Sequence, residues 1–253
     1  TVDDRGNNGS GGALQDTRSV FIDITPVDDL PSLARNAGAS ANEGAAVTIS
    51  NAMLRIDDVD TAASNLVYTL TAMPTNGTLR LSGSVLSVGQ TFTQANIDAG
   101  LLDYLHDDAE VFADGFTFAY SDANSTALGP ETFSVTITPV NDNDPVIQSD
   151  GAGIFANIGV NENTSAVTYV QAIDADLPAQ ALTYAVIGGA DAGRFTLNST
   201  TGELQFTVAT DFEVPTDSDT DNVYEVIVEA ADGLGRNDAQ QLFIQVLPNN
   251  DTD

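Results

Sequence analysis

The sequence contains no cysteine and no tryptophan, and His106 is its only histidine. Without cysteine the chain cannot form disulfides, thiolate metal sites or a cysteine nucleophile. A Ser-His-Asp triad would have only one possible base, and the neighbours Tyr104 and Leu105 predict a structural strand position for His106 instead. Paired carboxylates can hydrolyse glycosides, but here they fall in polar loops, without the apolar pocket that raises one pKa. We therefore expect that the chain is not an enzyme.

Basic residues are also scarce, since seven Lys and Arg face 37 Asp and Glu and give a formal charge of −30. Nucleic-acid affinity depends on basic side chains that neutralise phosphates, so we expect no nucleic-acid partner. Charge repulsion of this size weakens a compact fold unless cations neutralise it, which points to bound divalent ions. No apolar run reaches the roughly 18 residues of a membrane-spanning helix, and no basic-then-apolar start predicts a signal peptide.

Three related segments recur along the chain and indicate repeats. They lie at 23–29, 136–145 and 246–251, and each closes a stretch of alternating apolar and polar residues. Their prolines recur at intervals of roughly 110 residues, which is the size of one immunoglobulin-like sandwich. We therefore expect a tail at 1–29, interpreted as the end of a preceding truncated repeat, followed by complete modules at 30–140 and 141–253.

Alternation with a period of two predicts strands along both modules. It is clearest at Phe133, Val135 and Ile137, which are separated by serine and threonine. The same pattern occurs at 116–120, 224–230 and 242–246, and it predicts a further strand at 20–24 in the tail, while only 93–100 indicates a short helix or turn. The predicted fold class is all-β, with tandem immunoglobulin-like Greek-key β-sandwiches joined by short acidic linkers.

Acidic residues at alternate positions gather where strands begin or end. Asp58 and Asp60 precede a strand of the first module, and Asp174 and Asp176 hold the equivalent place in the second. Calcium takes roughly six to eight oxygen ligands from carboxylates, amides and carbonyls, so such pairs suit it. Residues 141–143 add three oxygen-bearing side chains between the modules, where a bound metal would set the angle between them.

Residues 141–253 resemble a cadherin repeat, because the calcium motifs of that family occur there in order. These motifs are Asn141-Asp-Asn-Asp-Pro145, Glu162 in Val-Asn-Glu-Asn-Thr, Asp174-Ala-Asp176, Asp211-Phe-Glu213 and Asp232 after an alanine. The chief departure is Pro139, where the linker of the family usually begins with Asp. The resemblance implies a calcium-binding, cadherin-like sandwich.

Residues 30–140 resemble instead the chondroitin sulfate proteoglycan (CSPG) type of cadherin-like repeat, found in tandem in large surface proteins. The matching motifs are Asn42-Glu-Gly44, Asp57-Asp-Val-Asp60, Pro74-Thr-Asn-Gly77, Phe92-Thr-Gln94 and Tyr104-Leu-His-Asp-Asp108. The resemblance implies a related sandwich with a less predictable calcium site.

Family geometry implies junctions that draw calcium ligands from one module, the linker and the next module. The main junction is expected to combine Glu43, Asn141, Asp142, Asn143, Asp174, Asp176 and Asp232. The following junction is expected to use Glu162, Asp211, Glu213 and Asp251, and the preceding one Asp28, Asp29, Asp58, Asp60 and Asp122; both are expected to be incomplete in this chain. A solvated interpretation is preferred for Asp107, Asp108 and Glu110.

These resemblances predict an extracellular or cell-surface segment for adhesion or for a stalk, stiffened by calcium. They imply homophilic adhesion, in which the partner is the same protein on another cell, with a surface glycan as another possible partner. The alternative is a calcium-stabilised spacer or carbohydrate-binding accessory module of a larger secreted enzyme. The low lysine count, with no lysine in the sequence, and the abundance of Asn, Asp, Gly and Thr favour a bacterial, secreted protein. The order of the repeats resembles that of large bacterial surface adhesins.

Overall fold

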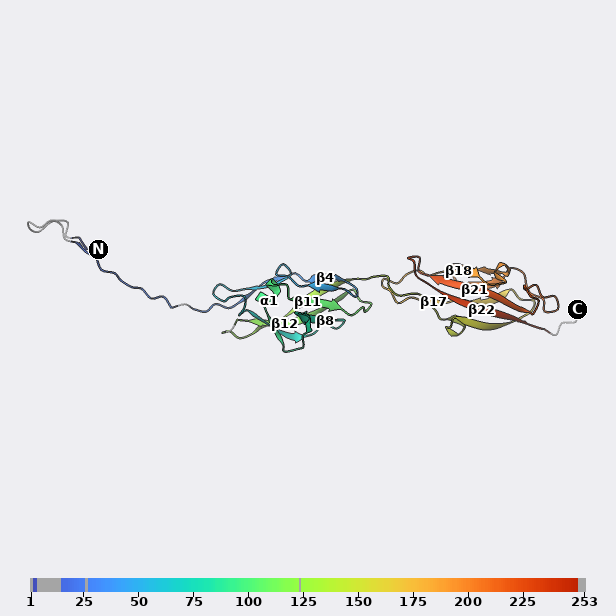
Figure 1. Cartoon of the computed structure of the whole chain (residues 1–253), viewed down its shortest axis with the longest axis horizontal. Coiled ribbons are helices and arrows are strands. Elements are labelled where there is room, and N and C mark those ends of the chain that lie inside the picture. Colours follow the sequence, from blue (N-terminus) through green and yellow to red (C-terminus); the bar gives the residue numbers. More distant parts are fainter. Residues whose placement is uncertain (1, 4–14, 26, 123, 250–253) are drawn as a thin grey trace, which may run out of the picture.

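The computed structural model describes residues 2–3, 15–25, 27–122 and 124–249. Two β-sandwiches lie end to end along the long axis, and an extended segment leads into the first of them (Figure 1). The helices of the described residues are α1 (Gln94–Asp98) and two short 3-10 turns (Ser149–Gly151 and Ala192–Arg194), and none of them could cross a membrane. The predicted all-β class is confirmed.

The first sandwich combines a five-stranded sheet of order β10-β7-β12-β13-β4 with a four-stranded sheet of order β5-β11-β8-β9, and β3 pairs with β6 beside them. β4 runs parallel to β13, so a strand from the beginning of the module pairs with its last strand. The strands are β3 (Ser32–Asn36), β4 (Ala39–Asn42), β5 (Ala46–Thr48), β6 (Leu54–Asp57), β7 (Val67–Ala72), β8 (Gly77–Leu81), β9 (Ser84–Val85), β10 (Thr91–Thr93), β11 (Leu102–His106), β12 (Ala113–Ser121) and β13 (Leu128–Thr138).

The second sandwich repeats this plan with a four-stranded sheet of order β15-β22-β21-β18, a three-stranded sheet of order β16-β20-β19 and a β14-β17 pair. β15 runs parallel to the last strand, β22, as β4 does to β13. The strands are β14 (Val146–Ile147), β15 (Phe155–Asn161), β16 (Ala166–Tyr169), β17 (Ala172–Ile173), β18 (Thr183–Gly188), β19 (Phe195–Leu197), β20 (Glu203–Phe206), β21 (Val223–Ala231) and β22 (Asn237–Leu247).

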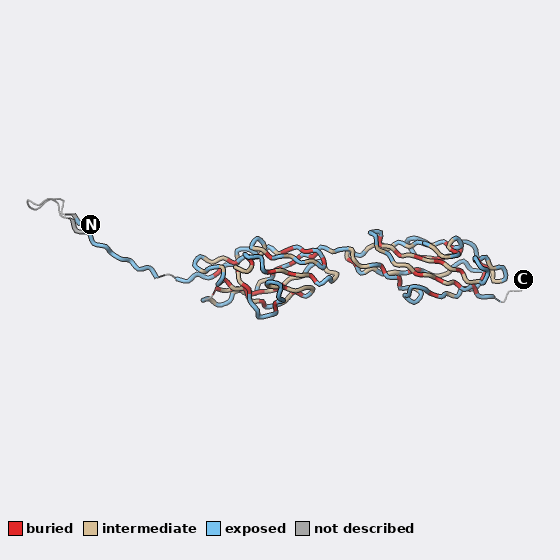
Figure 2. Tube along the Cα trace, in the orientation of Figure 1, coloured by how far each residue is buried: buried red, intermediate tan, exposed pale blue. Residues whose placement is uncertain are grey.

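Each sandwich has its own hydrophobic core, because the alternating strands turn every second side chain inward. Phe133, Val135 and Ile137 of β13 are buried while Ser134 and Thr136 between them are exposed, as the sequence predicts. The buried residues run through the middle of each module in Figure 2, and the linker between the modules carries few of them. The module boundaries at 30–140 and 141–253 stay a prediction. One hydrophobic core lies on each side of the boundary between residues 140 and 141.

The local prediction for residues 93–100 is confirmed by helix α1. The side chain of Thr93 accepts a hydrogen bond from the backbone N–H of Asn96, and the Asn96 side chain accepts one from the N–H of Thr93, so the helix begins with a capping box. His106 is buried at the end of β11, and its Nδ1 accepts from the N–H groups of Gly44 and Asp108, which fits the predicted structural role.

The predicted strand at 20–24 is wrong for this structure. These residues are extended but belong to no sheet, and Phe21 is 94% exposed. An alternating pattern forms a strand only where another strand supplies hydrogen-bond partners, and within the described chain nothing pairs with this segment. Among the described residues of the tail, strand pairing occurs only between β1 (Val2–Asp3) and β2 (Gln15–Asp16).

Candidate metal centre at the module junction

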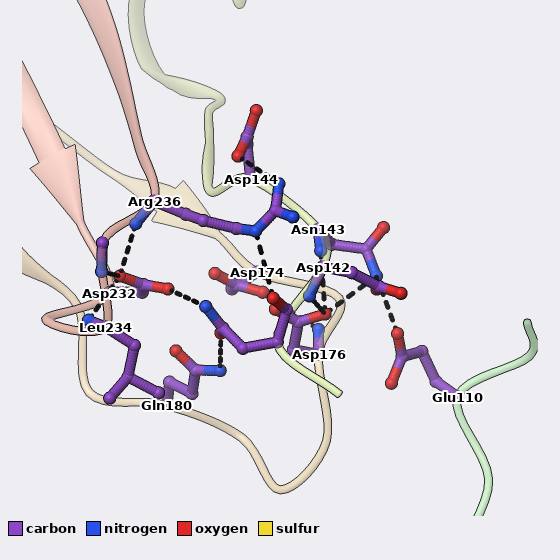
Figure 3. Close-up of polar contacts among 12 residues, drawn as sticks. Glu110, Asp142, Asn143, Asp144, Asp174, Asp176, Gln180, Asp232, Leu234 and Arg236 are labelled. Atoms are coloured by element: carbon purple, nitrogen blue, oxygen red, sulfur yellow. Dashed lines mark hydrogen bonds and ion pairs between the residues drawn. The ribbon is translucent and has the colours of Figure 1, made fainter. Parts of the chain in front are cut away.

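Acidic and amide side chains from both modules converge on the linker that joins them (Figure 3). The linker follows the end of β13 at Thr138. Asp174 and Asp176 occupy the loop after β17, and Asp232 follows the last residue of β21. Since strands of a sandwich deliver their loops to its two ends, these segments meet although they lie far apart in sequence.

Asp176 is the centre of the contacts with the linker. Its Oδ1 accepts from the backbone N–H of Asn143 at 3.1 Å and from the Asn143 side-chain Nδ2 at 2.8 Å. The same Nδ2 donates to Glu110 Oε1 at 2.7 Å and to Asp142 Oδ1 at 3.1 Å. Carboxylate oxygens of Glu110, Asp142 and Asp176 lie within 4.8 Å of one another, so three carboxylates share one neutral amide donor.

A second group of contacts ties the start of the linker to the second module. Asn141 Nδ2 donates to Asp232 Oδ2 at 2.8 Å, and its Oδ1 accepts from Gln180. Arg236 donates from Nε to the backbone oxygen of Asn141 at 3.1 Å and pairs with Asp144 at 2.9 Å. Six of the seven residues predicted for the main junction therefore lie in the linker or in the loops of the second module beside it.

Glu43, the seventh, comes from the first module, directly after β4. Its Oε2 accepts from the N–H of Val140 at 3.0 Å, so it fixes the beginning of the linker. Glu110, also from the first module, accepts through Oε2 from the N–H of Leu177 in the second module at 3.0 Å. The solvated interpretation of Glu110 is thus wrong. Its signal was the acidic spacing of Asp108-Ala-Glu110, which repeats that of Asp211-Phe-Glu213.

The junction contains buried carboxylate oxygens without a hydrogen-bond donor. They are Glu43 Oε1, Asp174 Oδ2 and Asp176 Oδ2, and Asp176 is only 1% exposed. Each buried oxygen without a partner costs about 1 to 3 kcal/mol, and more when it is charged. A hard cation would supply the missing partner, since calcium is coordinated by carboxylate, amide and carbonyl oxygens. The residues present therefore fit a calcium ion.

The surroundings at the junction shift the pKa values of Glu110 and Asp232. Desolvation, and after it the negative charges of Glu43, Asp176 and Asp142, raise the pKa of Glu110. Burial also opposes the ionisation of Asp232, but hydrogen bonds from Leu234, Asn141, Arg236 and Gly235 outweigh it and lower the pKa of that carboxyl. Asp232 is thus compensated by donors, whereas Glu110 carries repulsion that only a cation or a proton would relieve.

A second acidic group lies at the far end of the second module. Oxygens of Glu162, Asp211 and Glu213 lie within 4.8 Å of one another. Glu162 accepts from the N–H groups of Phe212 at 2.9 Å and Asn249 at 2.6 Å, and these bonds lower its pKa. Desolvation, and then the charge of Glu162, raise the pKa of Glu213. Asp251, the fourth predicted residue, lies outside the described residues.

The residues predicted for the preceding junction are only loosely gathered. The N–H of Asp29 donates to Asp60 Oδ2 at 3.3 Å, and Asp28 Oδ1 accepts from the Asn124 side chain at 3.3 Å. Asp58 and Asp122 each accept backbone N–H bonds from their own loops, and each has one buried oxygen without a donor.

Comparison with known protein families matches each module separately. Residues 31–137 match the family described as Cadherin-like, and residues 156–247 match the family described as Cadherin domain. The chain contains two cadherin-like domains. Both matched families are cadherin-like domains, and the matched relatives include an extracellular matrix protein; this supports an extracellular, adhesion-type role for the segment and confirms the prediction that it is not an enzyme.

The curated relatives are large matrix and surface proteins. Human extracellular matrix organizing protein FRAS1 is 29% identical over 181 residues, which cover 71% of this chain and 4% of that protein. Human chondroitin sulfate proteoglycan 4 is 36% identical over 109 residues, which cover 43% of this chain and 5% of that protein. The chain thus spans only a small share of each relative, and the resemblance to CSPG-type repeats is confirmed. The bacterial source stays a prediction.

Solved structures of consecutive cadherin repeats share the fold. Extracellular cadherin domains 1–4 of protocadherin gamma B7 superpose with a TM-score of 0.60 at 20% identity, covering 89% of this chain and 53% of that one. Mouse cadherin-23 repeats 22–24 give a TM-score of 0.57 at 22% identity, covering 87% and 68%. These matches confirm the tandem β-sandwich prediction.

Proposed function

We propose that this chain is an extracellular adhesion or stalk segment in which calcium bound at the junction holds the two cadherin-like domains in line. The observation that carries the proposal is the set of buried, unpartnered oxygens of Glu43, Asp174 and Asp176. They lie where the first module, the linker and the second module meet, so one cluster of ions would contact all three.

The ligands come from both sides of the junction. The first module supplies Glu43 and Glu110, the second supplies Asp174, Asp176 and Asp232, and the linker supplies Asn141, Asp142 and Asn143. The cation would provide the positive charge that this set lacks. The only described base in contact with it, Arg236, is already paired with Asp144.

Calcium would stiffen the junction because few hydrogen bonds between described residues join the modules directly. The bonds from Leu177 and Asn143 to Glu110 cross the junction, but they hold negatively charged groups close together. Without a cation, repulsion between these carboxylates favours separation of the modules. With it, the same carboxylates attract a shared ion and fix the angle between the domains.

The expected gain in stability is modest for each bound ion and large for the several ions of the junction together. Extracellular modules bind calcium with dissociation constants of roughly 0.1 to 1 mM. At a tenfold excess of free calcium over that value, each site contributes about 1.4 kcal/mol, so several sites together decide whether the linker is rigid.

Calorimetric titration with calcium at constant ionic strength tests the proposal. The double variant Asp174→Asn with Asp176→Asn should lose the tightest binding, because both side chains keep their shape but lose their charge. The control variant, Glu131→Gln with Glu229→Gln, removes the same formal charge from strands β13 and β21 and should bind as the unmodified chain does. Equal heats for all three proteins would refute a junction site.

The same reasoning extends to the ends of the chain. Glu162, Asp211 and Glu213, with Asp251, are proposed as half of a following junction. The corresponding half-site of a preceding junction is proposed at Asp28, Asp29, Asp58, Asp60 and Asp122.

Homophilic adhesion is the finer part of the proposal, and it rests on the cadherin resemblance. It is tested by sedimentation with and without calcium. Self-association that requires calcium would support it, and a monomer at all calcium concentrations would restrict the segment to a stalk.

A further inference from the structure

A third group of carboxylates lies inside the second module, in the loop between β20 and β21. Asp217, Asp219 and Asp221 alternate with Ser218 and Thr220, and oxygens of the three carboxylates lie within 4.8 Å of one another. None of these residues belongs to the ligand sets of the junctions. Among the described residues, no ion pair involves them.

Asp217 shows that this group is more than a solvated acidic loop. Only 5% of the residue is exposed. Its Oδ2 accepts from the backbone N–H of Asp221 at 2.8 Å, whereas its Oδ1 is buried and has no donor. A buried carboxylate oxygen of this kind is costly unless a cation or a further donor occupies the space beside it.

The loop is held in place by side chains that do not belong to the group. Asp191 is itself 5% exposed, and it accepts from the N–H groups of Ser218 at 2.6 Å and Glu225 at 2.9 Å. The hydroxyl of Tyr224, in the core, accepts from the N–H of Thr216 at 3.0 Å. The carboxylates are therefore presented by a fixed loop.

The repulsion within the group is visible at Asp219. Desolvation, and after it the charges of Asp221 and Asp217, raise the pKa of this carboxyl.

Acidic residues at alternate positions supply the first, third and fifth ligands of well-known calcium loops, in which the sixth residue makes a sharp turn. Here the sixth residue is Asn222, which has φ of 66°, the left-handed conformation that asparagine tolerates.

We propose that Asp217, Asp219 and Asp221 form an intradomain site for a hard divalent cation, calcium, in addition to the junction. The three carboxylates supply charge and oxygen ligands, and backbone carbonyls and water complete the shell. The site stabilises the loop that carries the following-junction residues, because Asn222 Nδ2 donates to the backbone oxygen of Phe212, between Asp211 and Glu213.

The test is a calcium titration of the full chain, followed by the backbone amide signals of residues 217–223 in heteronuclear NMR spectra at constant ionic strength. The site variant is Asp219→Asn, because this exposed side chain accepts from no backbone N–H of another described residue and its replacement keeps the fold. Asp23→Asn is the matched control in the tail. The junction variant Asp174→Asn with Asp176→Asn separates this site from the main junction.

The proposal expects saturable shifts at 217–223 in the unmodified chain, in Asp23→Asn and in the junction variant, with at least a fivefold weaker affinity in Asp219→Asn. Shifts that stay within those produced by sodium chloride in the folded chain would overturn it. So would shifts of unchanged affinity in Asp219→Asn, because the ion would then lie elsewhere. A response at 217–223 that survives loss of the junction response separates this inference from the proposed function.

Discussion

Replacement of Glu110 by glutamine should have opposite effects on stability with and without calcium. Oxygens of Glu110 lie within 4.8 Å of those of Asp142 and Asp176. Two unit charges at that distance repel by about 0.9 kcal/mol in a water-like dielectric. Because Glu110 is only partly buried, we take this screened value, which gives about 1.7 kcal/mol for the two pairs.

Glutamine removes this repulsion but weakens the hydrogen bond from Leu177, so we expect a net gain of about 1 kcal/mol in the calcium-free chain. For a module of this size the gain raises the thermal midpoint by about 4 °C. In calcium the repulsion is already neutralised, and the variant instead lacks a ligand. It should then lose up to about 1.4 kcal/mol for each ion at tenfold excess.

Thermal unfolding followed by circular dichroism, in chelator and in calcium at equal ionic strength, measures both effects. Glu131→Gln is the control, because Glu131 lies near the start of β13, at the opposite end of the strand from the junction. If Glu110→Gln lowers the midpoint equally in both conditions, Glu110 is only a hydrogen-bond acceptor for Leu177 and Asn143 and the charge argument is refuted.

Three further outcomes are expected. Because backbone N–H bonds lower the pKa of Glu162, its contribution to stability is complete above the unfolded pKa of about 4.5 and is lost as the pH falls. In chelator, the thermal midpoint of Glu162→Gln should therefore fall less steeply than that of the unmodified chain as the pH is lowered from 6 to 3, and parallel plots of midpoint against pH would contradict this. Gly202→Ala should destabilise by roughly 2 kcal/mol or more in urea unfolding, since φ is +71° and a Cβ would lie 2.0 Å from the backbone oxygen of Val170; an unchanged urea midpoint would show that the backbone relaxes there. Phe133→Ala should cost about 3 to 5 kcal/mol in the first core, and hydrogen exchange should show lost protection in 32–138 with 156–247 unchanged; equal loss in both would contradict separate cores.

The strands and the family were predictable because their signals are local. The alternation around Phe133 fixes which side chains face inward, and Asp174-Ala-Asp176 preserves a spacing that the loop geometry requires. The segment 20–24 carries the same alternation and yet forms no strand here, because pairing depends on a neighbour that the pattern does not reveal.

The candidate site was predictable in its linker but not in full. The Asp108-Ala-Glu110 spacing is a local signal for Glu110, but it does not show the role of this side chain, which depends on the loop after β17 reaching across the junction. Gln180 and Arg236 were missed for the same reason, because their contacts with Asn141 join residues far apart in the chain. The acidic loop at 217–221 was missed because the burial of Asp217 is a property of the fold.

The central claim, that calcium fixes the angle between the two modules, is tested most directly by a distance measurement across the junction. Because the chain has no cysteine, Ser84→Cys and Thr200→Cys place one spin label on each module at exposed positions. Double electron–electron resonance should give a broad distance distribution in chelator and a single narrow one in calcium. Distributions of equal width in both conditions would contradict the account.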